Sequence, residues 1–156
     1  MDKLVAELQN LLPDVQFTPG EVFSWSSYAR TITYAQKPAA EEHALWTLLH
    51  ESSHALLGHQ GYGYDFELLL LEVAAWEKAK QLAPEFGLEI DEDHIQDCLD
   101  TYRDWLHRRS TCPACQTVSL QASPQDYQCY NCRHRWSVTP ERFCRPYRRT
   151  KKPSVV

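Results

Sequence analysis

The chain has 156 residues, a hydrophobic content of 43% and a formal net charge of −5, which suits one ordinary domain with a small appendage and excludes a chain disordered over most of its length. It has no apolar run of about 18 residues to span a membrane and no apolar core of a secretory signal at its N-terminus, so we expect a cytoplasmic protein with reduced cysteines. The charge is uneven, because residues 1–102 hold 5 basic and 18 acidic residues (net −13) whereas residues 103–156 hold 11 and 3 (net +8), and this indicates two functional parts.

Helical periodicity predicts a first helix over residues 2–12. Residues 21–35 are rich in β-branched and aromatic side chains and predict two short strands. A second helix is expected from Pro38 to about Leu57, where Gly58 would end it. Apolar residues lie nearly all round this second helix, as is typical of a buried one.

Two more helices are expected, over about residues 66–83 and 91–107, with Asp65 as the N-cap of the first. After residue 110 the pattern changes to paired cysteines and short polar strands. We therefore expect a main domain over residues 1–110, a cysteine-bearing module over 111–147 and a basic tail over 148–156.

The second predicted helix carries His50-Glu51-Ser52-Ser53-His54. Residues four apart on a helix share a face, with Cβ atoms about 5–6 Å apart, so His50 and His54 can bind one ion. This is the H-E-x-x-H pattern, in which the two His bind zinc and the Glu acts as general base. The alternative is that they are core histidines with separate hydrogen-bond partners.

The next helix offers a third ligand. Stepping 100° per residue places Glu72 in the middle of an apolar stripe formed by Leu68, Leu69, Ala75, Trp76 and Ala79. A carboxylate aimed at the core must be paired, protonated or bound to a metal. A catalytic zinc normally keeps three protein ligands, and Glu72 is the candidate for the third ligand. The alternative is that Glu72 forms an ion pair with an Arg or a buried His.

Residues 46–79 resemble the ImmA/IrrE-like zinc metallopeptidases. The family pattern H-E-x-x-H-x-x-x-G-H is matched by residues 50–59, and its E-x-x-A-x-x-x-A by Glu72, Ala75 and Ala79. The resemblance implies an α+β fold of the minimal gluzincin type, a zincin-like helical core with a small antiparallel sheet. The sequence departs from the family at Ser53, where Gly is usual, and in lacking a helix-turn-helix domain.

The C-terminal module contains Cys112-Pro113-Ala114-Cys115 and Cys129-Tyr130-Asn131-Cys132. Two such pairs at this separation indicate a structural zinc held by four thiolates, and the segment resembles a zinc ribbon. A dithiol redox pair or disulfides are the alternatives. Cys98 is expected in a helix core, and Cys144 has no assigned role.

Together these features predict a zinc-dependent endopeptidase with one catalytic and one structural zinc, no small-molecule cofactor and no membrane partner. The mechanism is metal-assisted amide hydrolysis, in which a strand near Ile32–Tyr34 could align an extended peptide. The resemblance suggests a regulatory protein as substrate, such as a transcriptional repressor. The ribbon, with Arg133, Arg135 and the basic residues 145–152, would recruit substrate or DNA.

Two alternatives stay open. SprT-like enzymes join H-E-x-x-H to a terminal zinc ribbon and act on proteins bound to DNA. The basic ribbon favours this class. The sequence spacing of the third metal ligand argues against it. The second alternative is a non-catalytic DNA- or protein-binding module with two structural zinc sites, in which Glu51 would be dispensable.

Overall fold

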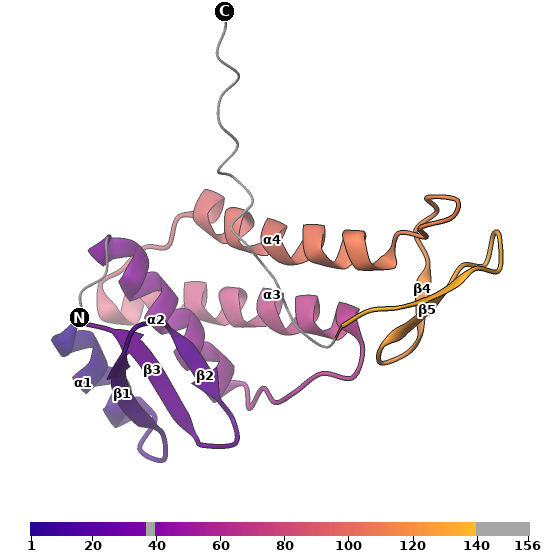
Figure 1. Cartoon of the computed structure of the whole chain (residues 1–156). Coiled ribbons are helices and arrows are strands. Elements are labelled where there is room, and N and C mark those ends of the chain that lie inside the picture. Colours follow the sequence, from indigo (N-terminus) through magenta and orange to yellow (C-terminus); the bar gives the residue numbers. More distant parts are fainter. Residues whose placement is uncertain (37–39, 140–156) are drawn as a thin grey trace, which may run out of the picture. The chain divides into compact units, whose positions relative to one another are not determined.

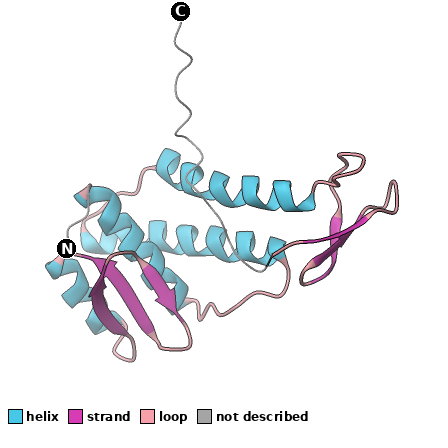
Figure 2. Cartoon of the chain, in the orientation of Figure 1, coloured by secondary structure: helices cyan, strands magenta, loops and turns pink. Residues whose placement is uncertain are grey.

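A computed structural model of the chain describes residues 1–36 and 40–139. The predicted α+β class is confirmed: the described residues form four α-helices and two three-stranded sheets (Figure 2). They divide into two compact units, one made of Met1–Gly61 with Leu71–Asp91 and the other of Tyr62–Leu70 with the residues from Glu92 onward. Within the described residues, no helix combines the length and the apolar character that crossing a bilayer requires. The predicted boundary near residue 110 stays a prediction.

The first unit contains helices α1 (Asp2–Leu11) and α2 (Glu41–Leu56), which end close to their predicted ends. The predicted start of the second helix at Pro38 lies outside the described residues. Helix α1 is amphipathic and buries one face, with Leu4, Val5 and Leu8 in the core. Helix α2 is buried along most of its length, as its composition predicts, and contacts β2 and β3 of the sheet beside it (Figure 1). The histidine pair therefore lies on a helix that the core holds firmly.

The first sheet consists of β1 (Gln16–Gly20), β2 (Ser24–Ser26) and β3 (Thr31–Ala35), in the order β1-β3-β2. It is mixed rather than wholly antiparallel as expected, because β1 runs parallel to β3 whereas β2 is antiparallel to it. The sequence does not predict β1, since it ends in Pro19-Gly20, a pair typical of turns. Proline is tolerated there because β1 is an edge strand.

The third helix, α3 (Asp65–Leu82), is followed by a short 3₁₀ turn (Ala83–Phe86) that Gly87 ends in the left-handed conformation. The predicted apolar stripe is confirmed except at Leu69, which is half-buried. Its other members are buried: Leu68, Glu72, Ala75, Trp76 and Ala79. Glu77, on the opposite side of the helix, is exposed. Glu72 is therefore a carboxylate inside the core.

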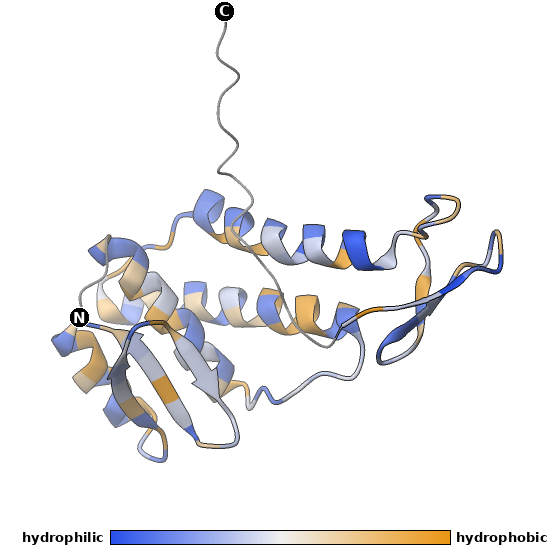
Figure 3. Ribbon diagram, in the orientation of Figure 1, coloured by the Kyte–Doolittle hydropathy of each residue, from blue (hydrophilic) through white to orange (hydrophobic). Residues whose placement is uncertain are grey.

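The second unit contains α4 (Glu92–Ser110) and an antiparallel sheet of β4 (Leu120–Ser123), β5 (Asp126–Gln128) and β6 (Arg135–Ser137), in that order. Hydrophilic residues dominate α4 (Figure 3), and its buried apolar side chains are Ile95, Leu99 and Trp105. Cys98, expected in this core, is only half-buried. Most of the core of the small sheet consists of Tyr127, Cys112 and Cys129.

Candidate metal centres

Three buried side chains converge between helices α2 and α3. Nε2 of His50 lies 3.1 Å from Nε2 of His54 and 3.1 Å from Oε2 of Glu72, and Nε2 of His54 lies 3.7 Å from the same oxygen. A tetrahedral zinc with bonds of about 2.0–2.1 Å separates its ligand atoms by about 3.4 Å. The spacing therefore suits a small cation between the three atoms, and these residues could hold a metal ion.

The charge on Glu72 suits this role. Burial by itself would raise the pKa of its carboxyl, but hydrogen bonds with His50 and His54 outweigh burial and hold the pKa far below its usual range. The carboxylate is therefore ionised, which is the form that a cation requires. The buried partners of Glu72 include two imidazoles, so the predicted aim of its side chain toward the histidine pair is confirmed.

The histidine rings are oriented by different neighbours. The His50 ring stacks on Trp76, with ring centroids 4.2 Å apart and an interplanar angle of 25°. The His59 ring contacts His54 on the side away from the cluster, with 2.9 Å between the two Nδ1 atoms. Burial, and after it the nearby His54, lowers the pKa of His59. His59 lies outside the group formed by His50, His54 and Glu72.

The remaining residues of the motif lie outside the ligand cluster. Glu51 is half-buried and follows His50 on α2, about 100° further round the helix. The hydroxyls of Ser52 and Ser53 donate hydrogen bonds of 2.8 Å to the carbonyls of Leu48 and Leu49. Ser53, which stands where the resembled family has Gly, is thus satisfied by its own helix.

Asp65 has a different role from the predicted cap. Asp65 is 2% exposed, and its carboxylate accepts hydrogen bonds from Arg109 Nε at 2.6 Å and from the Tyr127 hydroxyl at 2.7 Å. The start of α3 is satisfied by Glu67, whose Oε2 accepts the N–H groups of Gly63 and Tyr64 at 2.7 and 2.9 Å. The cap prediction is wrong, because the carboxylate of Asp65 is bonded to Arg109 and Tyr127 instead. These partners lie 44 and 62 residues further along the chain, so local sequence does not reveal them.

The four ribbon cysteines form the second cluster. Sγ of Cys112 lies 3.6 Å from that of Cys132, and Sγ of Cys115 lies 3.5 Å from that of Cys129. Disulfide sulfurs would be about 2.05 Å apart, whereas a tetrahedral zinc with bonds of about 2.3 Å separates its sulfurs by about 3.8 Å. The cysteines are free thiols, so the disulfide alternative is wrong, and the four could hold a metal ion.

The two cysteine pairs sit in equivalent turns. The N–H of Cys112 donates to the carbonyl of Thr117, and the N–H of Cys129 to that of His134, at 3.0 and 2.8 Å. Each pair is followed by a residue in the left-handed region, Gln116 with φ 62° and Arg133 with φ 65°. The repetition is typical of a structural metal site built from two matching knuckles.

The thiols differ in their acidity. Hydrogen bonding to Thr117 lowers the pKa of the Cys115 thiol to about 5. At Cys132 a backbone hydrogen bond with His134 favours the thiolate, but the neighbouring sulfur of Cys115 and the other thiols outweigh it and raise the pKa to about 12. Adjacent thiolates repel one another, so a cation is needed for all four to be ionised together at neutral pH.

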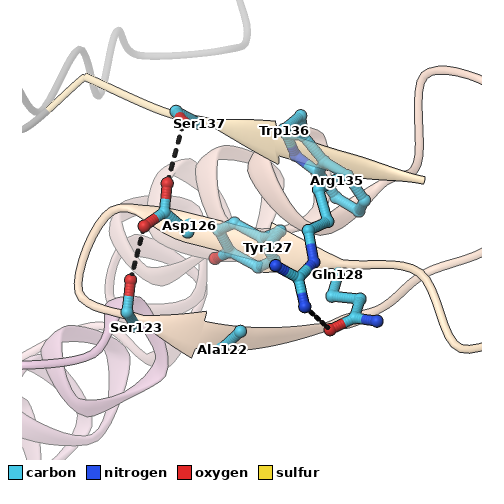
Figure 4. A pocket seen from close by; sticks show the side chains of 8 residues that line it. All are labelled: Ala122, Ser123, Asp126, Tyr127, Gln128, Arg135, Trp136 and Ser137. Atoms are coloured by element: carbon cyan, nitrogen blue, oxygen red, sulfur yellow. Dashed lines mark hydrogen bonds between the residues drawn. The ribbon is translucent and has the colours of Figure 1, made fainter. Parts of the chain in front are cut away.

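The residues of the ribbon sheet line a hollow of about 420 Å³ (Figure 4). In it, Asp126 accepts hydrogen bonds of 2.7 Å from the hydroxyls of Ser123 and Ser137, and Arg135 donates to the side chain of Gln128 at 3.2 Å. Its other lining residues are Ala122, Tyr127 and Trp136. The predictions for Cys144 and for the basic residues 145–152 lie outside the described residues.

No protein-family profile, no curated protein sequence and no solved structure matches the chain. The fold and the two clusters therefore define its class: an α+β protein with one candidate metal centre of two histidines and a glutamate, and another of four cysteines.

Proposed function

We propose that the chain is a zinc-dependent endopeptidase of the gluzincin, ImmA/IrrE-like type. The observation that carries the proposal is the convergence of His50 Nε2, His54 Nε2 and Glu72 Oε2 from two helices, with Glu51 directly after the first ligand. Two histidines and one carboxylate are the ligand set of several zinc peptidases, and they leave a fourth position open.

The protein side chains then have separate roles. His50, His54 and Glu72 would hold the zinc, which when bound would activate a water molecule and polarise a carbonyl. Glu51 would act as the general base toward that water and would later donate the proton to the leaving amine. Glu72 cannot do this, because its oxygen faces both imidazoles as a ligand. The ionised form of Glu72 also offsets the positive charge of the cation.

The ribbon has a supporting role in this proposal. Its four thiolates would hold a structural zinc, and the sheet would recruit a protein substrate, such as a transcriptional repressor, or nucleic acid. Arg133 and Arg135 against Asp126 give residues 111–139 a formal charge of 2 − 1 = +1. This charge supports only a weak phosphate contact from the described part of the ribbon. We expect the protein to be cytoplasmic, because thiols stay reduced in the cytoplasm.

One observation favours a non-catalytic alternative. His50, His54 and Glu72 are only 5, 8 and 4% exposed, and a closed ligand set is typical of a structural metal. Under this alternative, the first metal holds α2 against α3 and the chain is a binding module. The difference between the two proposals rests on Glu51, which is needed only for hydrolysis.

The test compares wild-type protein with Glu51→Gln, and with Glu77→Gln as a control at an exposed position of α3. Zinc-loaded full-length protein is incubated with unfolded protein substrates, and new peptide ends are identified by mass spectrometry. We expect cleavage by the wild type and by Glu77→Gln, and a loss of at least 100-fold in Glu51→Gln with its zinc content unchanged. Cleavage at the wild-type rate by Glu51→Gln, or no cleavage by any zinc-loaded form, would contradict the proposal.

A further inference from the structure

Helix α2 ends in a turn that brings residue 59 back over residue 54. Gly58 has a φ of 65°, a left-handed conformation that glycine adopts without strain. Its N–H donates to the carbonyl of Ala55 at 3.1 Å, and the N–H of His59 donates to the carbonyl of His54 at 3.0 Å. These two bonds form a Schellman motif, which places the second residue after the C-cap against a side chain of the last turn.

In most such turns the contact is between apolar side chains. Here it is a polar contact between two imidazoles, with the Nδ1 atoms of His59 and His54 2.9 Å apart and the ring centroids 4.9 Å apart. Nε2 of His54 faces His50 and Glu72, so Nε2 is the nitrogen available to a metal. A neutral imidazole that offers the lone pair of Nε2 carries its proton on Nδ1. Nδ1 of His54 must then donate the hydrogen bond, and Nδ1 of His59 must accept it.

His59 is also fixed from the sheet. Trp25 lies in β2 and is paired with Ile32 of β3. Its indole Nε1–H donates a hydrogen bond of 2.9 Å to the carbonyl of His59. The backbone of His59 is thus held on one side by the helix end and on the other by the first sheet, which fixes the position from which its ring reaches His54.

The other histidine ligand lacks such a partner. Nδ1 of His50 is buried and has no hydrogen-bond partner in the described part of the chain. Stacking on Trp76 restrains the plane of the His50 ring, but stacking does not select a tautomer. The cluster therefore has one ligand whose protonation is set by a hydrogen bond and one whose ring is set by packing.

We propose that His59 is a positioning residue of the first metal centre, which fixes the tautomer and the ring orientation of His54 through the turn that ends α2. The inference rests on the metal site of the proposed function and is independent of hydrolysis. Removing such an outer hydrogen bond usually weakens metal binding about 10- to 100-fold.

The test measures metal affinity in the full-length protein. Co²⁺ is titrated against a competing chelator, and the thiolate charge-transfer absorption reports the cysteine centre separately from the histidine centre. His59→Leu supplies the apolar contact that is usual in such a turn but removes the acceptor, and we expect the affinity of the histidine centre to fall about 10- to 100-fold. His59→Asn restores an acceptor oxygen and is expected to recover most of the affinity. The cysteine centre should bind equally in all three proteins.

A second pair of variants separates the turn from general stability. Gly58 and Gly87 have φ values of 65° and 68°, and a Cβ at either position would meet nothing within 4 Å. Gly58→Ala and Gly87→Ala should therefore destabilise the protein to a similar extent through backbone strain alone. We expect only Gly58→Ala to weaken the histidine centre, because only that turn carries His59.

Two results would overturn the inference: wild-type affinity in a folded His59→Leu variant, or an equal loss in His59→Leu and His59→Asn. Nitrogen-15 NMR of the Zn²⁺-loaded protein gives an independent readout, since the inference requires the proton of His54 on Nδ1. A wild-type protein that binds metal with this pattern but cleaves nothing would refute the peptidase proposal and leave the role of His59 intact.

Discussion

The Nε atom of Arg109 on α4 donates a hydrogen bond of 2.6 Å to the carboxylate of Asp65, the first residue of α3. The same carboxylate accepts a bond of 2.7 Å from the hydroxyl of Tyr127 on β5. The guanidinium of Arg109 also lies 4.6 Å from the centre of the Trp105 ring and donates to the carbonyl of Thr139. A buried ion pair therefore joins both helical segments of the second unit to the ribbon sheet.

We predict that Asp65→Ala strongly destabilises the second unit. The side chains of Arg109 and Asp65 are 12 and 3% exposed, and removing one partner of a buried pair leaves an uncompensated charge that costs about 3–5 kcal/mol. Asp14→Ala is the matched control, since Asp14 pairs with Arg30 on the surface and such pairs contribute about 0–1 kcal/mol. Urea unfolding of the metal-loaded proteins measures both effects. Equal changes in the two variants would contradict the prediction.

Tyr127 should make the protein sensitive to alkali. Burial, followed by the hydrogen bond to Asp65, raises the pKa of its phenol well above the ordinary value. Because the folded state holds the proton more tightly, this stabilisation is complete below about pH 10, the pKa of an unfolded tyrosine, and is lost as pH rises further. We expect Tyr127→Phe to reduce the fall in stability above pH 10. Tyr28→Phe, at a fully exposed side chain, is the control, and unfolding at a series of pH values is the measurement.

We predict two metal ions per chain, because two separate ligand sets converge. His50→Ala should remove one ion and Cys112→Ser the other, since each centre loses a ligand while the other stays complete. Native mass spectrometry of zinc-loaded protein counts the ions directly. A single ion that survives His50→Ala and disappears in Cys112→Ser would show that only the ribbon binds metal.

Glu72→Gln should release the metal of the first centre. The substitution keeps the shape of the side chain but removes the negative charge that faces both histidines, and a neutral amide oxygen is a weaker zinc ligand than a carboxylate. We expect the affinity of this centre to fall at least 100-fold and the cysteine centre to keep its metal. Glu77→Gln, on the exposed side of α3, is the control. Equal zinc affinity in the two variants would mean that Glu72 is not a ligand.

The sequence predicts the first cluster well because each part of it depends on local periodicity. His50 and His54 share a helix face, and Glu72 stands out as a carboxylate within an apolar stripe. Spacing likewise predicts the four cysteines. The structure brings both sets together as the patterns suggest, while zinc itself and its chemistry stay predictions.

Long-range partners explain what the sequence does not reveal. Asp65 reads as a helix cap, and its true partners lie 44 and 62 residues further along the chain. Strand β1 is missed because Pro19 is acceptable only at an edge, which depends on the order of the strands. The contact between His59 and His54 has a local signal, the left-handed Gly58, and a Schellman turn would have predicted it.

The order β1-β3-β2 has a consequence for how a peptide could approach. Ile32 and Thr33 lie on the central strand and are paired with both neighbouring strands, whereas Tyr34 pairs with β1 and lies beyond the residues that β2 pairs. The expected segment Ile32–Tyr34 therefore has little unpaired backbone with which to align a substrate. The edge beside α2 belongs to β2, which has three residues, Ser24–Ser26. A chain adding there would form a very short ladder, too brief to select a sequence by main-chain pairing, so selectivity would have to come from side-chain recognition.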